Sequence, residues 1–242
     1  MYYMMLEDNL LECYLKFKNG ECDDVDTINR ILHYIKTPIL FTKSQLSKVD
    51  TALQKSILSS LGNYRIKDNI EEAAKDTVFK VILSDTKDYF PYVNIKNDII
   101  ENNFTATFKQ NMNRNKAKLH LKSLFESCNE ILIRDPYLLY NNVFDSMLNF
   151  AQEIFNDKEL KVYFSFNKRN KQKSFRELKE EFNKINQNWE IKEDKNNTYS
   201  ASHDRYILID RKIEIILTSG IEHLYDLEKD FTYIIRLLLK SN

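Results

Sequence analysis

One stretch decides how this chain is interpreted: His203-Asp204-Arg205-Tyr206-Ile207-Leu208-Ile209-Asp210. Its apolar centre predicts a strand over residues 205–209. Side chains alternate between the two faces of a strand, so we expect His203 and Arg205 on one face and Asp204 and Tyr206 on the other. An imidazole can attack phosphorus or carry a proton, and a guanidinium can hold two phosphoryl oxygens. The stretch therefore predicts a strand that presents phosphate-directed side chains.

A second apolar run follows and ends at Ser219-Gly220, nine residues after Asp210. The chain has only three glycines, which makes a glycine at this place informative. A backbone without a Cβ allows a tight turn or the close approach of a substrate. A plain turn at the end of the strand is the other interpretation of Gly220, and both remain open.

Upstream, a hydrophobic run over residues 130–134 ends at Asp135-Pro136-Tyr137. The carboxyl ends of strands are where α/β sheets gather their functional loops. Asp135 is therefore a candidate to orient His203 or Arg205. An ordinary turn started by Asp-Pro explains the same residues equally well.

Residues 203 to 219 resemble the signature of the phospholipase D superfamily, in which H-x-[K/R]-x4-D is followed by a Gly-Ser pair. Arg205 stands where most members have Lys, and Ser219 precedes its glycine instead of following it. Residues 115–242 more closely resemble the phospholipase D-like domain that follows MIT domains, which also carries a His-Asp-Arg string. This resemblance implies an α/β fold, a phospholipase D-like sandwich.

The resemblance also implies roles for single residues. In the superfamily the His forms a phospho-histidine intermediate, and the Lys and the Ser bind phosphate; by position these roles fall on His203, Arg205 and Ser219. The motif Asp, here Asp210, orders a turn, and an acid after the Ser strand, here Asp230, supports the nucleophile. Neither a metal nor another cofactor is implied. The best-known members of the MIT-linked family bind membranes or partners, with no demonstrated catalysis.

The His-Asp-Arg string has a purely structural interpretation as well. At the start of a strand it can form an ion pair with a capping histidine, and short motifs often occur without their function. The other histidines, His33, His120 and His223, lack the spacing of metal ligands, although His223 can line the same cleft as His203. No P-loop, G-x-G-x-x-G, G-x-S-x-G or H-E-x-x-H motif is present, so nucleotide, dinucleotide, serine-esterase and zincin chemistries have no support.

Net charge does not point to a partner. Lys+Arg and Asp+Glu both number 36, so no overall field attracts nucleic acid or an anionic membrane. Two stretches are locally basic, and each can follow a phosphate backbone or form a solvated surface. The first comprises Lys168, Arg169, Lys171, Lys173, Arg176 and Lys179, of which the first four are candidate nucleic-acid contacts. The second comprises Lys109, Arg114, Lys116, Lys118 and Lys122.

Cysteine usage and hydropathy predict a cytoplasmic protein. Three cysteines at irregular spacing, with no C-x-x-C, indicate reduced thiols and no zinc site. The N-terminal residues meet acids too early for a signal peptide. No stretch approaches 18 uninterrupted apolar residues, so we expect no transmembrane segment.

Hydrophobic periodicity predicts two parts. Helices are predicted over residues 4–18, 26–35 and 69–75, with one further helix from residue 42 or 44 to 61 and a strand over 77–83. Beyond residue 113, predicted strands alternate with helices and then follow one another, which indicates a mixed sheet. We therefore expect a mainly helical N-terminal region, residues 1–112, and a phospholipase D-like α/β domain, residues 113–242.

Two functions follow from these observations. The first is a metal-independent phosphodiesterase, above all a nuclease; because the family mechanism uses two histidines and this chain has one motif, we expect a homodimer that joins two His203 side chains. The second is a non-catalytic module that binds a phosphate-bearing ligand, a membrane headgroup, or a protein partner through the N-terminal helical region. A role in bacterial anti-phage or mobile-element defence rests on family analogy alone.

Overall fold

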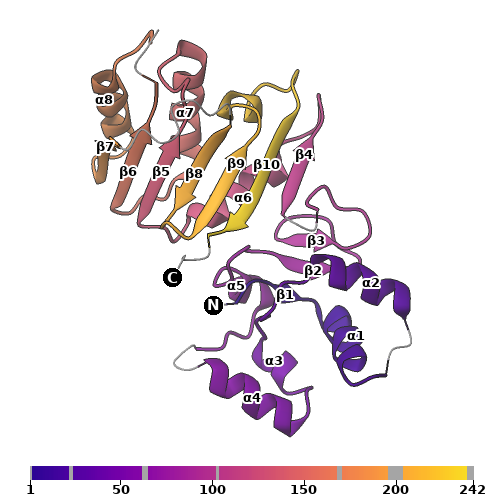
Figure 1. The fold of residues 1–242 in the computed structure, drawn as a ribbon. Coiled ribbons are helices and arrows are strands. Elements are labelled where there is room, and N and C mark those ends of the chain that lie inside the picture. The colour runs from indigo at the N-terminus through magenta and orange to yellow at the C-terminus, as the bar shows by residue number, and fades with distance from the viewer. Residues whose placement is uncertain are drawn as a thin grey trace. The chain divides into compact units, whose positions relative to one another are not determined.

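The computed structural model describes residues 2–21, 24–61, 65–101, 104–167, 171–195 and 204–238. They form two compact units, Met1–Asp98 and Ile99–Asn242, which differ in architecture (Figure 1). The predicted division into domains between residues 112 and 113 stays a prediction, because a compact unit is defined by contacts and a domain by independent folding.

The first unit joins a small sheet to a set of helices. Its strands pair in the order β1-β2-β3 and all run parallel; they are β1 (Met5–Leu6), β2 (Ile82–Ser84) and β3 (Tyr92–Asn94). The helices are α1 (Asp8–Lys18), α2 (Val25–Tyr34), α3 (Lys43–Leu46), α4 (Thr51–Leu61) and α5 (Ile70–Ala74). Parallel strands are normally covered on both faces, and the strand residues of this unit are buried. The region is mainly helical, as predicted.

Three predicted elements of the first unit are wrong in extent. The helix predicted over residues 4–18 begins only at Asp8, because Met5 and Leu6 pair with β2 as strand β1. The other two elements contain a break within a continuous apolar pattern. The helix predicted to end at residue 61 is two helices, because the Asp50 carboxylate caps a new helix by accepting from the Ala52 N–H at 2.9 Å. The strand predicted over residues 77–83 begins only at Ile82, because Lys80 adopts a left-handed backbone with φ of 57°. The apolar pattern continues across both breaks, so periodicity alone does not reveal them.

The second unit is built on one sheet in the order β4-β10-β9-β8-β5-β6-β7. Its strands are β4 (Thr105–Phe108), β5 (Glu130–Arg134), β6 (Leu160–Ser165), β7 (Trp189–Glu193), β8 (Arg205–Ile209), β9 (Ile213–Leu217) and β10 (Phe231–Leu237). Its helices are α6 (Asn115–Phe125), α7 (Asn141–Ile154), α8 (Phe175–Ile185) and the 3₁₀ helix η1 (Ile221–Leu224). β5, β6 and β7 are parallel and the remaining pairs antiparallel. The predicted α/β fold with a mixed sheet is confirmed.

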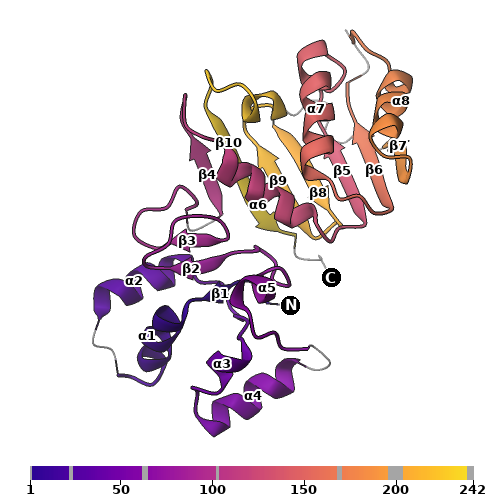
Figure 2. The same cartoon turned by 180° about the vertical axis from the view of Figure 1, so that it is seen from behind.

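One face of this sheet carries the helices. Figures 1 and 2 view the second unit from opposite sides and show α6, α7 and α8 on the same face. Successive side chains of a strand point to opposite faces, and alternate residues such as Ile131, Ile133 and Val162 are buried in this layer. Burying each side chain of this size contributes about 2 kcal/mol. A shift of one residue would expose the whole set, so the core fixes the register.

The central strand β8 pairs antiparallel with β5 on one side and β9 on the other. Ile207 lies opposite Ile133 of β5 and Ile215 of β9. In antiparallel pairs the start of one strand lies beside the end of its partner. Arg205 and the loops that follow β5 and β9 therefore lie together at one end of these three strands, which is called the Arg205 edge of the sheet below.

Membrane-spanning length and thiol state were also predicted from the sequence. Within the described ranges, no helix has the length and apolar character needed to cross a bilayer. Cys13 and Cys128 are free thiols, and Cys22 lies outside the described residues. Burial raises the pKa of Cys128 to about 12, so this thiol stays protonated at neutral pH.

Candidate active site

Arg205 opens β8 at the edge where the two loops meet. Its side chain is 17% exposed, and its Nε lies 3.9 Å from Asp135 Oδ1. Its guanidinium carbon lies 5.0 Å from the centre of the Tyr137 ring, within the range of a cation–π contact. Asp135 and Tyr137 both belong to the loop after β5, so this loop positions the guanidinium.

Asp135 is a buried acid, only 2% exposed. Its Oδ1 accepts from the Tyr137 N–H at 2.8 Å, which is the turn that Asp-Pro sequences favour. The pKa of Asp135 is raised from 3.8 to about 6, mainly because burial penalises its charge; the Tyr137 N–H and Arg205 oppose the shift, and the charge of Glu222 adds to it. Both predicted roles of Asp135 therefore hold: it starts a turn and it orients Arg205.

Ser219 follows β9 at the same edge. Leu217 lies opposite Arg205 in the sheet, and Ser219 is two residues beyond it. The Ser219 hydroxyl oxygen is buried and has no hydrogen-bond partner among the residues that the structure describes. A buried polar group left unbonded costs about 1–3 kcal/mol, so this hydroxyl is suited to bond a ligand.

Gly220 lies directly beneath the carboxylate of Glu222. A Cβ added at Gly220 would lie 1.9 Å from Glu222 Oε2, so a larger residue fits only if the carboxylate moves. The backbone does not require glycine, because φ at Gly220 is −67°, a value open to most residues. Close approach therefore explains Gly220, and the approaching group is the chain's own carboxylate. Within the described ranges, Glu222 Oε2 is buried without a hydrogen-bond partner.

Asp210 lies at the opposite end of β8 from Arg205. Asp210 and Arg211 adopt the left-handed region, with φ of 47° and 52°, in the turn that joins β8 to β9. Asp210 Oδ1 accepts from the N–H groups of Asn129 and Glu130 at 3.0 and 2.9 Å. The side chain thus fastens this turn to the start of β5, in keeping with the turn-ordering role that the resemblance implies; a part in the chemistry stays a prediction.

Asp230 precedes β10 and lies on the Arg205 side of the sheet, two strands from β8. Its Oδ2 accepts from Lys109 Nζ and its Oδ1 from the Gln110 N–H, both at 2.9 Å. The bond from Lys109, with that from Gln110, lowers the pKa of Asp230. The backbone carbonyl of Asp230 bonds His223 Nδ1 at 3.0 Å. Asp230 fastens the end of β4, and its support of a nucleophile stays a prediction.

The second basic stretch is partly taken up by internal contacts. Arg114 is buried and donates to the carbonyls of Lys109 at 3.0 Å and Lys229 at 2.6 Å. Burial lowers the pKa of Arg114. Lys118 Nζ pairs with Glu153 at 3.0 Å. The interpretation of this stretch as a phosphate-tracking surface is therefore wrong for Arg114, which joins two loops inside the unit.

The first basic stretch and the motif histidine are described in part. Outside the described residues lie Lys168, Arg169 and His203. Lys171 is exposed. Lys173 Nζ lies 4.0 Å from Glu177 and 5.6 Å from the centre of the Phe144 ring. Contact between this stretch and nucleic acid stays a prediction.

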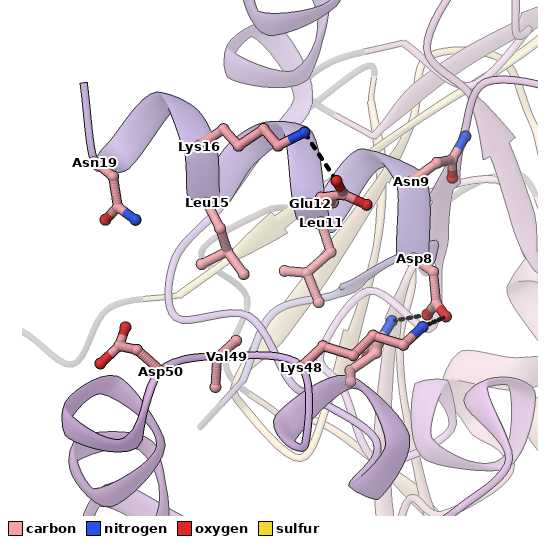
Figure 3. Close-up of a pocket in the computed structure, with 11 residues that line it drawn as sticks. Asp8, Asn9, Leu11, Glu12, Leu15, Lys16, Asn19, Lys48, Val49 and Asp50 are labelled. Atoms are coloured by element: carbon pink, nitrogen blue, oxygen red, sulfur yellow. Dashed lines mark hydrogen bonds and ion pairs between the residues drawn. The ribbon is translucent and has the colours of Figure 1, made fainter. Parts of the chain in front are cut away.

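The first unit has a pocket of its own, of about 570 Å³, between α1 and the turn from α3 to α4 (Figure 3). Leu11, Leu15 and Val49 line its apolar middle. Asp8 and Lys48 form an ion pair at 2.5 Å at one end. A pocket of this size, with an apolar middle and a rim of polar and charged side chains, suits a small ligand or a side chain of a partner.

Sequence reasoning missed Glu222. Its carboxylate turns back over Gly220 because η1 begins directly after that residue, and no pattern in the sequence marks this turn. The available signal was the rare glycine itself. In the part of the chain that the structure describes, no three His, Cys, Asp or Glu side chains gather to hold a metal ion.

Residues 116–237 match the family model described as a phospholipase D-like domain at the C-terminus of MIT. The matched stretch covers half of the chain and contains β5 to β10 together with Asp135, Arg205 and Glu222. No curated protein matches the chain.

Proposed function

Because the chain belongs to the family of phospholipase D-like domains found at the C-terminus of MIT, we propose that it binds and cleaves phosphodiesters without a metal, and that it is a nuclease. The observation that carries this proposal is Arg205, held between Asp135 and Tyr137 in the strand that follows the motif histidine. A guanidinium fixed in this way offers a fork to two phosphoryl oxygens.

The proposed roles follow the family motif. His203 attacks phosphorus and forms a phospho-histidine intermediate. Arg205 and the buried hydroxyl of Ser219 orient the phosphoryl oxygens and stabilise their charge. Asp210 and Asp230 support this arrangement from the turn after β8 and from the loop before β10. Contacts to a longer nucleic-acid backbone fall to Lys168, Arg169, Lys171 and Lys173.

The leaving oxygen needs a proton donor. If that donor is a second motif histidine, as in the family, two chains must meet with their His203 side chains across a two-fold axis. We infer a homodimer on this ground. A rate per chain that stays constant on dilution from dimer to monomer would contradict it.

Cleavage assays test the proposed activity. The full chain is incubated with plasmid DNA, single-stranded RNA and bis(p-nitrophenyl) phosphate, each in EDTA. We expect cleavage that survives EDTA and falls by at least about 10³-fold in His203→Ala. His33→Ala, on the exposed side of α2, is the matched control and should keep the wild-type rate. An unchanged rate in His203→Ala would overturn the proposal.

The second candidate is a non-catalytic module for a phosphate-bearing ligand, a membrane headgroup or a protein partner. The pocket of the first unit favours it, because partner binding uses surfaces beyond the motif. Here Arg205 matters more than His203. Binding of a phosphodiester or of phosphatidylinositol-phosphate vesicles that is lost in Arg205→Ala and kept in His203→Ala, with no cleavage by the wild type, would establish this function.

A place in anti-phage or mobile-element defence is proposed by analogy with the family. Bacteria that express the chain should then form fewer plaques on phage challenge, and His203→Ala should abolish the difference. Equal plaque counts with and without the chain would remove this part of the proposal.

A further inference from the structure

Asp135 and Arg205 lie together at this end of β8, and the Glu222 carboxylate lies over Gly220 in the loop that follows β9. Asp135 lies 3.9 Å from Arg205 Nε, and the charge of Glu222 acts on Asp135 as well. A buried carboxylate is stable when a cation compensates it, and one guanidinium carries one charge. A buried acid that has one guanidinium and a second carboxylate near it is therefore expected to hold its proton more tightly than an ordinary aspartic acid.

Asp135 is the group that holds this proton. Asp135 is buried, whereas Glu222 is partly exposed. Within the described part of the chain, the charges that act on Asp135 are those of Arg205 from β8 and Glu222 from η1. From β6, the Ser165 carbonyl accepts from the Asp135 N–H at 3.0 Å. The raised pKa of Asp135, about 6, agrees with this placement of the proton.

The position of the carboxyl group suits a proton donor. The 3.9 Å between Arg205 Nε and Asp135 Oδ1 is longer than one hydrogen bond and shorter than two, since each measures about 2.9 Å. One phosphate oxygen can therefore lie within hydrogen-bond reach of both groups. Oδ1 accepts the Tyr137 N–H with one lone pair, and a protonated carboxyl oxygen keeps this acceptor capacity while it donates its own proton.

We propose that Asp135 is a further catalytic residue, which donates its proton to the oxygen of the leaving group, and that Glu222 is a positioning residue, which keeps that proton on Asp135. The proposal rests on the phosphodiesterase function proposed above. It assigns this proton transfer to Asp135 within one chain, in place of the second histidine from which the homodimer was inferred. The two assignments exclude each other, and a rate per chain that stays constant on dilution to monomer favours Asp135.

The atoms balance over the two steps. In the first, the lone pair of the attacking imidazole nitrogen forms the P–N bond, the P–O bond to the leaving alcohol breaks with its electron pair, and that oxygen takes the Asp135 proton. In the second, a water oxygen attacks phosphorus and gives a proton to the Asp135 carboxylate. The P–N bond then breaks and returns its electron pair to the imidazole. The products are an alcohol and a phosphomonoester, and Asp135 is protonated again.

Two variants test the proposal without altering Asp135. Glu222→Gln removes the charge at constant size. Gly220→Ala places a Cβ 1.9 Å from Glu222 Oε2 and displaces that flexible carboxylate, while φ of −67° accepts alanine. Both changes withdraw a like charge from Asp135. Both should therefore lower its pKa, by about half a pH unit.

The first readout is the pH dependence of the rate on a dinucleotide, whose leaving alcohol needs a proton, unlike p-nitrophenolate. An acid must be protonated to donate, so the wild-type rate should fall as the pH rises through about 6. In Glu222→Gln and Gly220→Ala this fall should move to lower pH, with little change in the rate at pH 5. Glu130→Gln is the matched control. Glu130 is an acid at the opposite end of β5 from Asp135, where it pairs with Arg211.

The second readout does not depend on activity. The full chain is labelled with ¹³C at aspartate carboxyl carbons. The Asp135 signal is assigned by its loss in Asp135→Asn, or in Asp135→Ser if the first variant does not fold. The proposal is supported if the Asp135 signal titrates at lower pH in both Glu222→Gln and Gly220→Ala, and if the fall of the rate with pH moves in the same direction. A shifted signal with an unmoved profile overturns the donor role while the phosphodiesterase function stands. Absence of cleavage by the wild type overturns both, and an unshifted signal overturns the role of Glu222.

Discussion

The two ends of β8 differ in how their polar side chains are satisfied. At one end, the Asp210 carboxylate accepts two backbone N–H groups from the start of β5. At the other, Arg205 stands at 3.9 Å from a buried carboxyl whose pKa is raised to about 6. Hydrogen bonds to backbone amides stabilise a fold whatever the substrate, whereas imperfectly matched buried charges lower stability. The first end therefore stabilises the fold, whereas the second keeps an imperfectly compensated buried acid, as the proposed chemistry requires.

The largest expected effect is the loss of Arg205 at the second end. Arg205→Ala removes the fork that orients the phosphoryl oxygens, so the rate of phosphodiester cleavage should fall by about 10²- to 10³-fold. The rate is measured with bis(p-nitrophenyl) phosphate. Arg211→Ala is the matched control, because it removes an arginine from the other end of the same strand. Equal losses of cleavage rate in Arg205→Ala and Arg211→Ala would show that the two ends of β8 do not differ in their part in the reaction.

The pH dependence of stability tests the buried acid. The pKa of Asp135 is higher in the folded chain, about 6, than its ordinary value of 3.8, so the folded state binds the proton more tightly. Its stabilising contribution is complete below pH 3.8 and is lost as the pH rises through 6. The unfolding free energy of the wild type relative to Asp135→Asn should therefore fall by roughly 3 kcal/mol across this window.

Urea titrations at pH 4.5 and 7.5 measure most of that change. Thr218→Val, on an exposed residue of the same edge with no titrating group, controls for general effects of substitution. A difference between the wild type and Asp135→Asn that is the same at both pH values would show that Asp135 is ionised in the folded chain throughout.

At the Asp210 end the effect should be on stability alone. Asp210→Ala removes both bonds to the Asn129 and Glu130 N–H groups and places alanine at a φ of 47°. The unfolding free energy should fall by about 2 kcal/mol. The rate per folded molecule should stay within a factor of about three. Asp210→Asn keeps an acceptor and should recover part of the stability; a hundredfold loss of rate in either variant would place Asp210 in the chemistry.

The smallest effect is expected for the ion pair between Arg211 and Glu130. Its N–O distance is 2.7 Å, but the Arg211 side chain is 74% exposed. Exposed pairs contribute at most about 1 kcal/mol, so Arg211→Ala should change the unfolding free energy by about 0.5 kcal/mol or less. A loss as large as that of Asp210→Ala would mean that the charge pair, and not the amide bonds, holds the turn.

The sequence predicts part of the site around Arg205, because two features of that site depend only on neighbouring residues. The strand at residues 205–209 and the Asp-Pro turn at residue 135 each follow from neighbouring residues. Their encounter depends on the antiparallel pairing of β8 with β5, which residue patterns do not reveal. The sequence offers only the rule that α/β sheets gather functional loops at the ends of strands. Arg205 and Asp135 could therefore be proposed together before the structure was known.

What the sequence could not predict depends on contacts between distant residues. Arg114 counted as one cation of a basic stretch, yet it bonds a carbonyl 115 residues away at Lys229. Glu222 carried no signal, because its position over Gly220 depends on where η1 begins. Periodicity describes one segment at a time, whereas burial and pairing are set by the whole fold.

The place of β8 in the sheet has a consequence for synthesis. β5 and β8 are neighbours in the sheet, but α7, β6, α8 and β7 lie between them in the chain. While the chain is being made, β5 has an open edge until β8 arrives, and such edges invite aggregation. Pairing over such a separation is slow. The strand that closes the sheet is also the one that brings Arg205 to Asp135. Under the proposed nuclease function, a newly made or half-folded chain therefore has no assembled site with which to attack the nucleic acid around it.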